Sequence, residues 1–317
     1  MGFEGLLGND RLKENLTRSL SRGRGGHFYL ISGPEGSGKR TLARLLAAAL
    51  MCTAEAGRPC CSCPQCRKVL GNTHPDFITV DDPEKKTVPV DLIRQARADM
   101  YIQPNEGQRK IYLFPRAHDM GIPGQNALLK VLEEPPSYGV FLLLVDNPQK
   151  LLTTIRSRCV ELSLSPLPEE LLYRQLRSRF PEVSNDTLKA VYSRSGGYLG
   201  QALGLLSGEN EVLQETADLV RAFANKNQLA QTQVLVTMEK WKRDRLIEAL
   251  FQWKSLFTEA LACRGGGTAV SPLAKELSTR RGPDELLGAI RVLDKCIEYA
   301  QGNVSPAAIC GYLVWAL

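Results

Sequence analysis

The sequence predicts an α/β domain with a parallel sheet, followed by a part of the chain that is entirely helical. Three observations lead to this fold class. Short apolar runs alternate with helical patterns over residues 1–165. A glycine-rich loop joins the first apolar run to a helix. After Pro166 no further strand pattern is convincing, and the remaining apolar residues recur at helical spacing.

The expected elements follow the chain in a regular order. Buried strands are expected at 27–32, 76–80, 110–114, 140–145 and 160–164, and helices between them at 41–51, 90–101 and 122–134. Three short helices are expected next, at 168–179, 184–193 and 199–206. A hinge is expected at 207–210, and helices from 211 onward with breaks near 264–267 and 281–283. This organisation predicts three domains, at 1–166, 167–208 and 209–317.

The bulk composition is that of an ordinary globular protein. The chain has 317 residues and a net charge of +6, without a run of Lys or Arg that would demand nucleic acid as a partner. No stretch approaches the roughly 20 apolar residues of a membrane helix, and the N-terminus lacks a signal-peptide pattern. We therefore expect a cytoplasmic protein without membrane contact, in which the nine cysteines do not form a disulfide framework.

The glycine-rich loop is Gly33-Pro-Glu-Gly36-Ser-Gly38-Lys39, between an expected strand and helix. Glycines let backbone N–H groups surround a phosphate, and Lys39 would reach the β- and γ-phosphates. The usual Mg²⁺-binding Ser or Thr directly after the lysine is absent. Arg40 stands there, and Thr41 comes one place late. A phosphate-binding ancestry is predicted, and binding of ATP stays open.

The third expected strand ends in Pro115 and Arg116. In a P-loop ATPase this strand ends in acidic residues that hold Mg²⁺ and polarise the attacking water. Proline offers a metal nothing, and arginine repels it. Asp119 lies too far along the chain to replace the missing carboxylate. The sequence therefore predicts an ATPase fold that has lost its hydrolytic chemistry.

A cysteine cluster lies between residues 52 and 66. Two overlapping C-x-x-C steps join Cys60, Cys63 and Cys66, and Cys52 precedes them at the end of a helix. This spacing predicts a closed Zn²⁺ site with four sulfur ligands and a structural role. Cys61 lies beside Cys60 and could compete for its place, although it breaks the spacing.

The segment Ser157-Arg158-Cys159 precedes the last expected strand. An isolated arginine is usually a surface charge. In a ring-forming ATPase, however, a loop at this place can project toward the next subunit. Arginine has a fixed charge and a fork of donors, which suit a γ-phosphate in the transition state.

These motifs together resemble one family. The phosphate loop and the cysteine cluster are followed in order by Thr73-His-Pro-Asp76, Asn126-Ala-Leu-Leu-Lys-Val-Leu-Glu-Glu-Pro-Pro136, Asn147-Pro-Gln-Lys150 and Ser157-Arg-Cys159. The same order is typical of bacterial clamp-loader ATPases of the AAA+ class. The resemblance covers residues 1 to about 205 and implies an AAA+ P-loop domain with a zinc module, a helical lid and a helical collar.

The resemblance also implies a subunit type. Motor subunits of this family, gamma/tau, would have Thr after the loop lysine and Asp-Glu after the third strand. They would also have Thr at the end of the 140–145 strand and Arg at the start of the helix near 200. Here those positions hold Arg40, Pro115-Arg116, Val145-Asp146 and Gly200. Four departures favour the delta prime type of the DNA polymerase III holoenzyme, a nucleotidyltransferase assembly. Such a subunit is expected to have no ATPase or polymerase activity of its own.

The mechanism implied by the resemblance needs partners. Five subunits, including gamma/tau and delta, would form an open ring through their collars, and load the sliding clamp on primed DNA. Arg158, with Ser157, would complete the ATP site of the neighbouring gamma/tau subunit. A helical stripe of Ile290, Leu293, Ile297 and Ala300 is expected either to join the collars or to be internal core. Two other functions remain open at this point, an active gamma/tau-like motor and a zinc-dependent DNA-binding protein.

Overall fold

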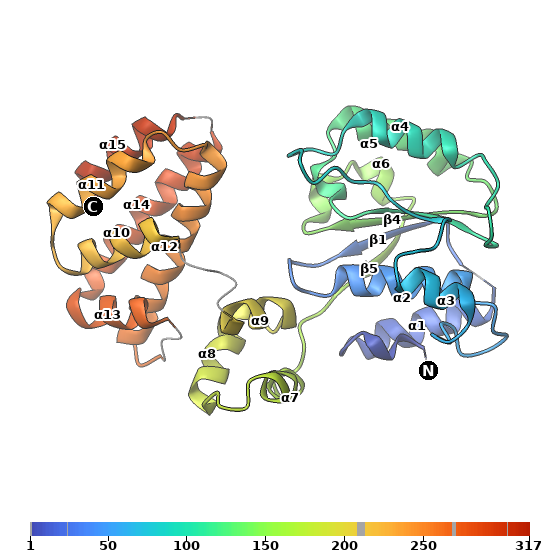
Figure 1. The fold of residues 1–317 in the computed structure, drawn as a ribbon, viewed down its shortest axis with the longest axis horizontal. Coiled ribbons are helices and arrows are strands. Elements are labelled where there is room, and N and C mark those ends of the chain that lie inside the picture. Colours follow the sequence, from blue (N-terminus) through green and yellow to red (C-terminus); the bar gives the residue numbers. More distant parts are fainter. Residues whose placement is uncertain (1, 24, 208–212, 268–270, 303) are drawn as a thin grey trace. The chain divides into compact units, whose positions relative to one another are not determined.

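The computed structural model describes residues 2–23, 25–207, 213–267, 271–302 and 304–317. Within these ranges the chain forms two compact units (Figure 1). The first comprises residues up to 172 together with 196–201, and the second comprises 173–195 and the residues from 202 onward. The expected hinge at 207–210 and the domain boundary at 208–209 lie mostly outside the described residues. The division into three domains therefore stays a prediction.

The first unit contains a five-stranded parallel sheet, so the expected fold class is confirmed. Its strand order is β2-β3-β4-β1-β5, with all described pairings parallel. The strands are β1 (Phe28–Ser32), β2 (Phe77–Thr79), β3 (Lys110–Phe114), β4 (Gly139–Val145) and β5 (Val160–Ser163). All five lie within two residues of the bounds that the apolar runs predict.

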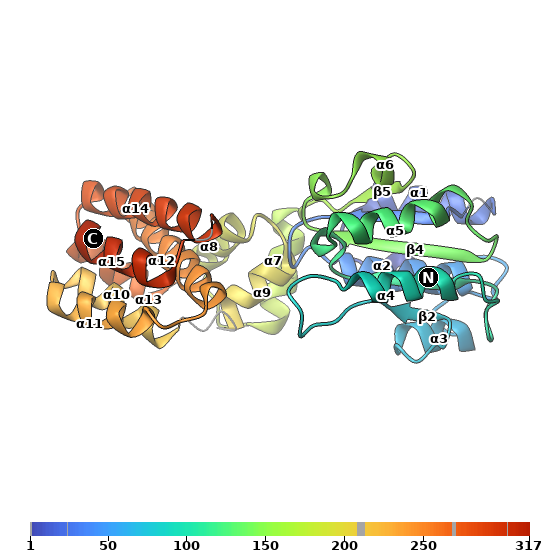
Figure 2. The same cartoon turned by 90° about the horizontal axis from the view of Figure 1, so that it is seen from above.

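Helices cover both faces of this sheet, as the uninterrupted apolar strands require. One face carries α1 (Asp10–Ser21), α2 (Lys39–Met51) and α3 (Pro64–Leu70), and the other carries α4 (Val90–Asp99), α5 (Ile122–Glu133) and α6 (Thr153–Arg156) (Figures 1 and 2). Short 3₁₀ turns lie at Phe3–Gly5, Ala117–Asp119 and Pro148–Lys150. Helices α1, α3 and α6 are not among those that the sequence pattern predicts.

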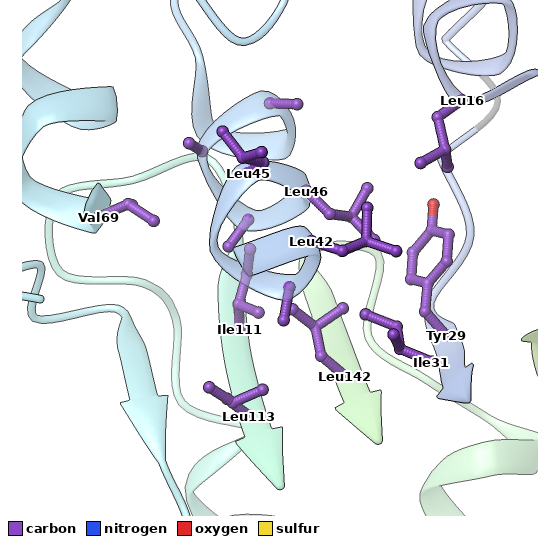
Figure 3. Close-up of a cluster of buried hydrophobic side chains, with 14 of the residues drawn as sticks. Leu16, Tyr29, Ile31, Leu42, Leu45, Leu46, Val69, Ile111, Leu113 and Leu142 are labelled. Atoms are coloured by element: carbon purple, nitrogen blue, oxygen red, sulfur yellow. The ribbon is translucent and has the colours of Figure 1, made fainter. Parts of the chain in front are cut away.

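Side chains alternate strictly between two cores, because successive residues of a strand point to opposite faces. On β1, Tyr29 and Ile31 pack against α2, whereas Phe28 and Leu30 pack against α4 and α5. Figure 3 shows the first of these cores, in which residues from β1, β3, β4 and α2 meet. On the other face the ring of Phe141 stacks on Phe28 with centroids 4.9 Å apart. The two cores hold the carboxyl ends of the strands in fixed register.

The second unit is helical among its described residues. Helices α7 (Glu169–Arg179), α8 (Asn185–Ser195) and α9 (Leu199–Ser207) come first, and α7 and α9 cross from one unit to the other. The rest are α10 (Gln214–Ala224), α11 (Gln228–Met238), α12 (Arg243–Arg264), α13 (Pro272–Arg280), α14 (Pro283–Gln301) and α15 (Pro306–Ala316). The breaks expected near 264–267 and 281–283 are confirmed. None of the described helices is long and apolar enough to cross a membrane.

The apolar stripe on α14 is internal core, so the expectation that it joins collars is wrong. Leu293 and Ala300 are fully buried, Ile297 is nearly so, and Ile290 is half-buried. They pack in a cluster that includes the buried Trp253 of α12. Helical spacing alone could not separate the two readings, because an interior stripe and an interface stripe have the same period.

A buried carboxylate fixes the connection into β3. Asp76, just before β2, accepts backbone N–H groups of Asn105, Glu106 and Gly107 at 2.6–2.8 Å. Burial raises the pKa of the Asp76 carboxyl, but these hydrogen bonds outweigh burial and hold the pKa below its usual value. His74 of the same motif contacts Gln65 of α3. The motif therefore ties α3 and the 105–107 loop to the sheet.

We expect Asp76→Asn to destabilise the protein by about 2 kcal/mol at neutral pH. The NH₂ group of the asparagine would face backbone N–H donors that the carboxylate now accepts, and one donor would lose its partner. Since the folded pKa is depressed, the stabilisation is present above the unfolded pKa of about 4 and is lost as pH falls through the folded value. The difference in the free energy of unfolding between wild type and variant should therefore become smaller below pH 4. Urea unfolding at several pH values measures this. The exposed Asp91→Asn serves as control, and an equal loss in both variants would contradict the role of Asp76.

Candidate nucleotide and metal sites

The phosphate loop has the backbone geometry that its glycines predict. It runs from the end of β1 to the first turn of α2, and Gly36 and Gly38 have φ values of 73° and 97°. These left-handed conformations favour glycine. Arg40 and Thr41, which replace the usual Thr, are both exposed on the first turn of α2. The loop is thus a normal strand–loop–helix junction.

The ammonium group of the loop lysine is hydrogen-bonded to oxygen atoms of the chain itself. Lys39 Nζ donates to the carbonyl of Pro34 at 2.8 Å and to that of Gly33. It also forms an ion pair of 2.6 Å with Asp146 Oδ1. Asp146 follows β4 directly, at one of the positions where the sequence departs from a motor. Because the Lys39 side chain is only 11% exposed, its charge is directed into the protein.

A second contact closes the loop from the side of α9. The Gly200 N–H donates to the Gly36 carbonyl at 2.9 Å, and Gln201 Nε2 donates to the Glu35 carbonyl at 3.0 Å. Residues 196–201 belong to the same compact unit as the loop. Residues at the start of α9 therefore lie against the phosphate loop and bond to two of its carbonyl oxygens.

The end of β3 carries a cation that is fully paired. Arg116 Nη2 lies 2.7 Å from Asp81 Oδ1, and it also donates to the Asp82 carbonyl at 2.9 Å. The hydrogen bonds to Asp81 raise the pKa of the Arg116 guanidinium. Asp119 lies 3.7 Å from Arg116 and 3.7 Å from His118, so it faces these groups. The place of a Mg²⁺-binding carboxylate pair is thus taken by an arginine salt bridge.

The four cysteines of the predicted zinc site come together. The sulfur atoms of Cys52, Cys60, Cys63 and Cys66 all lie within 4.8 Å of one another. Cys52 ends α2, and Cys63 caps α3, whose Cys66 is fully buried. Four thiolates at this separation suit a tetrahedral Zn²⁺, with no position left for water or substrate. The cluster can therefore hold a structural metal ion.

Hydrogen bonds support the thiolate form of three of these ligands, whereas burial raises the pKa of the Cys66 thiol. The N–H groups of Cys60, Cys63 and Cys66 donate to the sulfurs of Cys52, Cys60 and Cys63 in turn, at 3.3–3.4 Å. Hydrogen bonds from Ser62 lower the pKa of the Cys60 thiol to about 5. Cys61 is exposed with a φ of 57° and lies outside the group of four. This geometry favours Cys60 over Cys61 as the ligand.

The metal cluster and the phosphate loop lie at opposite ends of α2. This helix has 13 residues, which separates its ends by about 20 Å. A zinc ion in the cluster would hold α3 against α2 and take no part in chemistry at the loop.

The Ser157–Cys159 segment follows α6 at the surface. The Arg158 side chain is 41% exposed, and its guanidinium donates to the Thr154 carbonyl at 3.1 Å and to Glu133 Oε1 at 3.4 Å. Ser157 Oγ donates to the Thr154 carbonyl at 3.3 Å. Burial raises the pKa of the Cys159 thiol to about 12, so this thiol stays protonated and uncharged. The segment presents Arg158 outward on an anchored turn.

A residue that the sequence analysis missed positions this segment. Gln125 of α5 is only 3% exposed, and its amide donates to the carbonyls of Met120 and Lys150 at 2.9 and 3.2 Å. Its Oε1 accepts the N–H of Leu152 at 2.8 Å, directly before α6. A buried glutamine with these three hydrogen bonds ties two connections together, the one at Met120 and the one at 150–152. Only its position beside the Asn126 motif could have drawn attention to it.

Comparison with known proteins identifies the family. The family described as DNA polymerase III, delta subunit, matches residues 8–168. The chain belongs to this DNA polymerase III family. It is 36% identical over 213 residues to the delta' subunit of Escherichia coli, covering 67% of this chain and 64% of that protein. It is also 29% identical over 276 residues to the gamma subunit of a Buchnera aphidicola strain, covering 82% of this chain and 75% of that one.

Members of this DNA polymerase III family differ in length. The chain is 31% identical to the tau subunit of E. coli over 82% of its own length, but it spans only 42% of that protein. A solved structure of a gamma subunit-related protein from Thermotoga maritima has a TM-score of 0.46 and 20% identity, covering 95% of this chain and 97% of that one. Family membership alone thus leaves the subunit type open, since delta' and gamma relatives both match.

For the metal site we expect Cys63→Ser to abolish binding of about one zinc per chain and to lower the thermal unfolding midpoint, because metal binding is coupled to folding. Cys61→Ser is the matched control, since Cys61 lies outside the cluster. Elemental analysis and thermal unfolding measure the two effects. Zinc content that survives in Cys63→Ser, or a wild-type protein that is stable without metal, would contradict the assignment.

Proposed function

We propose that this chain is a delta prime-type subunit of the DNA polymerase III clamp loader. It does not hydrolyse ATP itself, and it supplies Arg158 as an arginine finger to the ATP site of a neighbouring gamma/tau subunit. Its partners are gamma/tau and delta subunits in a ring of five, which loads the sliding clamp on primed DNA. Zinc has a structural role in the subunit.

The observation that carries this proposal is the salt bridge between Arg116 and Asp81. Hydrolysis at a P-loop needs Mg²⁺ beside the phosphates and an acidic group to orient the attacking water. At the end of β3 this chain has a guanidinium, whose positive charge repels a metal ion. Asp81, the nearest carboxylate, is already bound to that guanidinium at 2.7 Å. The end of β3 therefore offers neither a free carboxylate to hold the metal nor the base that hydrolysis requires.

Arg158 has the properties of a residue that acts on another subunit. Its side chain is partly exposed, and its partner Glu133 is 60% exposed. An exposed ion pair of this kind is worth at most about 1 kcal/mol, so a nucleotide phosphate could displace Glu133 at small cost. Gln125 accepts the N–H of Leu152 at the start of α6, the short helix that leads into the turn carrying Arg158. A rigid support with a releasable guanidinium suits phosphoryl transfer in trans.

The helical second unit supports a role in assembly. Among its described residues, apolar side chains are exposed on two helices that pack together, α11 and α15. These side chains are Leu229, Val236, Val314 and Trp315, and the last is 83% exposed. Large apolar groups of this exposure are typical of surfaces that bind another protein. These exposed side chains are candidate collar contacts, in place of the buried stripe on α14.

The proposal predicts opposite effects for two basic residues. In a reconstituted loader, Lys39→Ala should leave ATP turnover nearly unchanged, whereas Arg158→Ala should lower it by a few tens of per cent. Arginine fingers contribute on the order of 10³–10⁵ in rate, but only one of several ATP sites in the ring would use Arg158. Steady-state hydrolysis with clamp and primed DNA measures this.

Arg94→Ala is the control, since Arg94 is an exposed arginine of the same unit with only a surface partner. Greater damage from Lys39→Ala than from Arg158→Ala would identify the chain as a motor of the gamma type. Equal turnover in Arg158→Ala and wild type would remove the arginine-finger assignment.

A further inference from the structure

We propose that the outer edge of β5, together with the groove beside α1, binds an extended segment of another protein as an added β-strand. The ligand class is a peptide in which apolar and basic residues alternate. The inference goes beyond the proposed function, which uses neither β5 nor α1. Exposed sheet edges bind peptides in this way because main-chain hydrogen bonds supply affinity and pockets for alternate side chains supply specificity.

The outer edge of β5 has backbone groups that face no neighbouring strand. β5 is the last strand in the sheet order, and among the described residues it pairs with β1 alone. Leu164, which continues β5, donates its N–H to the Ser32 carbonyl of β1 at 2.9 Å. Backbone groups of successive strand residues point to opposite sides, so the N–H and C=O groups of Glu161 and Ser163 point away from β1. These groups form an open hydrogen-bonding edge.

The next outward position, Ser165, shows that this edge accepts a partner. The Ser165 N–H donates to Asn9 Oδ1 at 2.8 Å, and Asn9 Nδ2 donates to the Ser165 carbonyl at 3.4 Å. The side-chain amide thus bonds as a residue of a neighbouring strand would. An asparagine before a helix usually accepts an N–H of the first turn, but Asn9 makes no such bond with α1. Its amide serves the sheet edge instead, which leaves the two preceding outward positions for a ligand.

A groove runs beside this edge and determines half of the ligand's side chains. Its volume is about 570 Å³, within the range of ligand sites in proteins. Its apolar lining comes from α1 and the sheet, and consists of Leu12, Leu16, Tyr29, Val160 and Leu162. Figure 3 shows Leu16 of α1 beside Tyr29 of β1. Every second side chain of an added strand would enter this groove, so these side chains have to be apolar.

The other face of β5 determines the remaining side chains. Glu161 points to the face opposite Leu162, because successive strand residues alternate. Its side chain is 50% exposed, and Arg156 Nε lies 3.8 Å from its Oε1. An ion pair this long and exposed contributes little. A Lys or Arg of an added strand would lie beside Glu161, and opposite charges on neighbouring strands attract. The ligand therefore alternates apolar with basic residues.

The test uses the full chain and a synthetic eight-residue peptide that alternates valine with lysine. The first readout is exchange of backbone amide hydrogens, followed by NMR. In the free protein Leu162 and Leu164 should exchange slowly, because they face β1, whereas Glu161 and Ser163 should exchange fast. Saturating peptide should slow exchange at Glu161 and Ser163 at least about tenfold, since bonded amides exchange only after opening. Exchange at Leu162 and Leu164 should change less.

Glu161→Pro is the decisive variant, because proline removes an N–H that faces away from β1, and edge strands tolerate proline there. Glu161→Ala is the matched control, since it removes the same side chain and keeps the N–H. Calorimetry should show that Glu161→Pro binds the peptide at least about tenfold more weakly than Glu161→Ala. Val160→Lys changes no backbone group and places a charge in the groove. It should weaken binding at least about fivefold.

Two N-methylated peptides test the main-chain bonds from the ligand's side. One carries the methyl groups on its valine amides and the other on its lysine amides, and one of the two should bind at least about tenfold more weakly than the parent. Thermal unfolding midpoints show whether the variants fold, and Val160→Lys with the methylated peptides tests the site even if Glu161→Pro does not fold.

Four results would overturn the inference. The first is a peptide that does not bind, and the second is equal binding by Glu161→Pro and Glu161→Ala. The third is binding that leaves exchange at Glu161 and Ser163 unchanged, since the peptide would then lie elsewhere. The fourth is a dimer in sedimentation whose free form already protects both amides, because a second copy of the chain would then occupy the edge.

Discussion

The parallel direction of the strands is the constraint on which the candidate site depends. Because all described strand pairings are parallel, β1, β3 and β4 end at one edge of the sheet, with Ser32 paired to Val145 and Phe114 to Leu143. The residues that follow these strands are therefore brought together, although they are far apart in the chain. The same edge would hold the phosphates and the metal of a working ATPase. In this chain it holds two internal ion pairs.

In both ion pairs a carboxylate of the chain neutralises a basic side chain. Lys39 and Arg116 are the basic groups at the edge, and each is neutralised by a carboxylate of the chain, Asp146 and Asp81. Both cations are partly buried, with side chains 11% and 24% exposed, and a carboxylate partner stabilises each of them. Both of these cations are thus paired within the chain. Arg158 differs, because its partner Glu133 is exposed and weakly held.

The sequence could predict what depends on local pattern. The strand runs, the zinc spacing and the missing acidic pair at Pro115-Arg116 are all readable along the chain, and the cysteine geometry agrees with the spacing. Contacts between distant segments were not readable. The pairing of Lys39 with Asp146 and the approach of Gly36 to Gly200 depend on tertiary geometry. Gln125 was missed because a glutamine in a helix is usually exposed, and burial decides its role.

The most direct test of the account is a structure of the reconstituted loader with a Mg²⁺–nucleotide and a γ-phosphate mimic such as beryllium fluoride. The account predicts that the Arg158 guanidinium lies within hydrogen-bond distance of the mimic in the neighbouring subunit. It also predicts that Lys39 stays paired with Asp146 and that Arg116 stays paired with Asp81. Nucleotide and Mg²⁺ bound at this chain's own Lys39, with Arg158 away from any phosphate, would contradict the account.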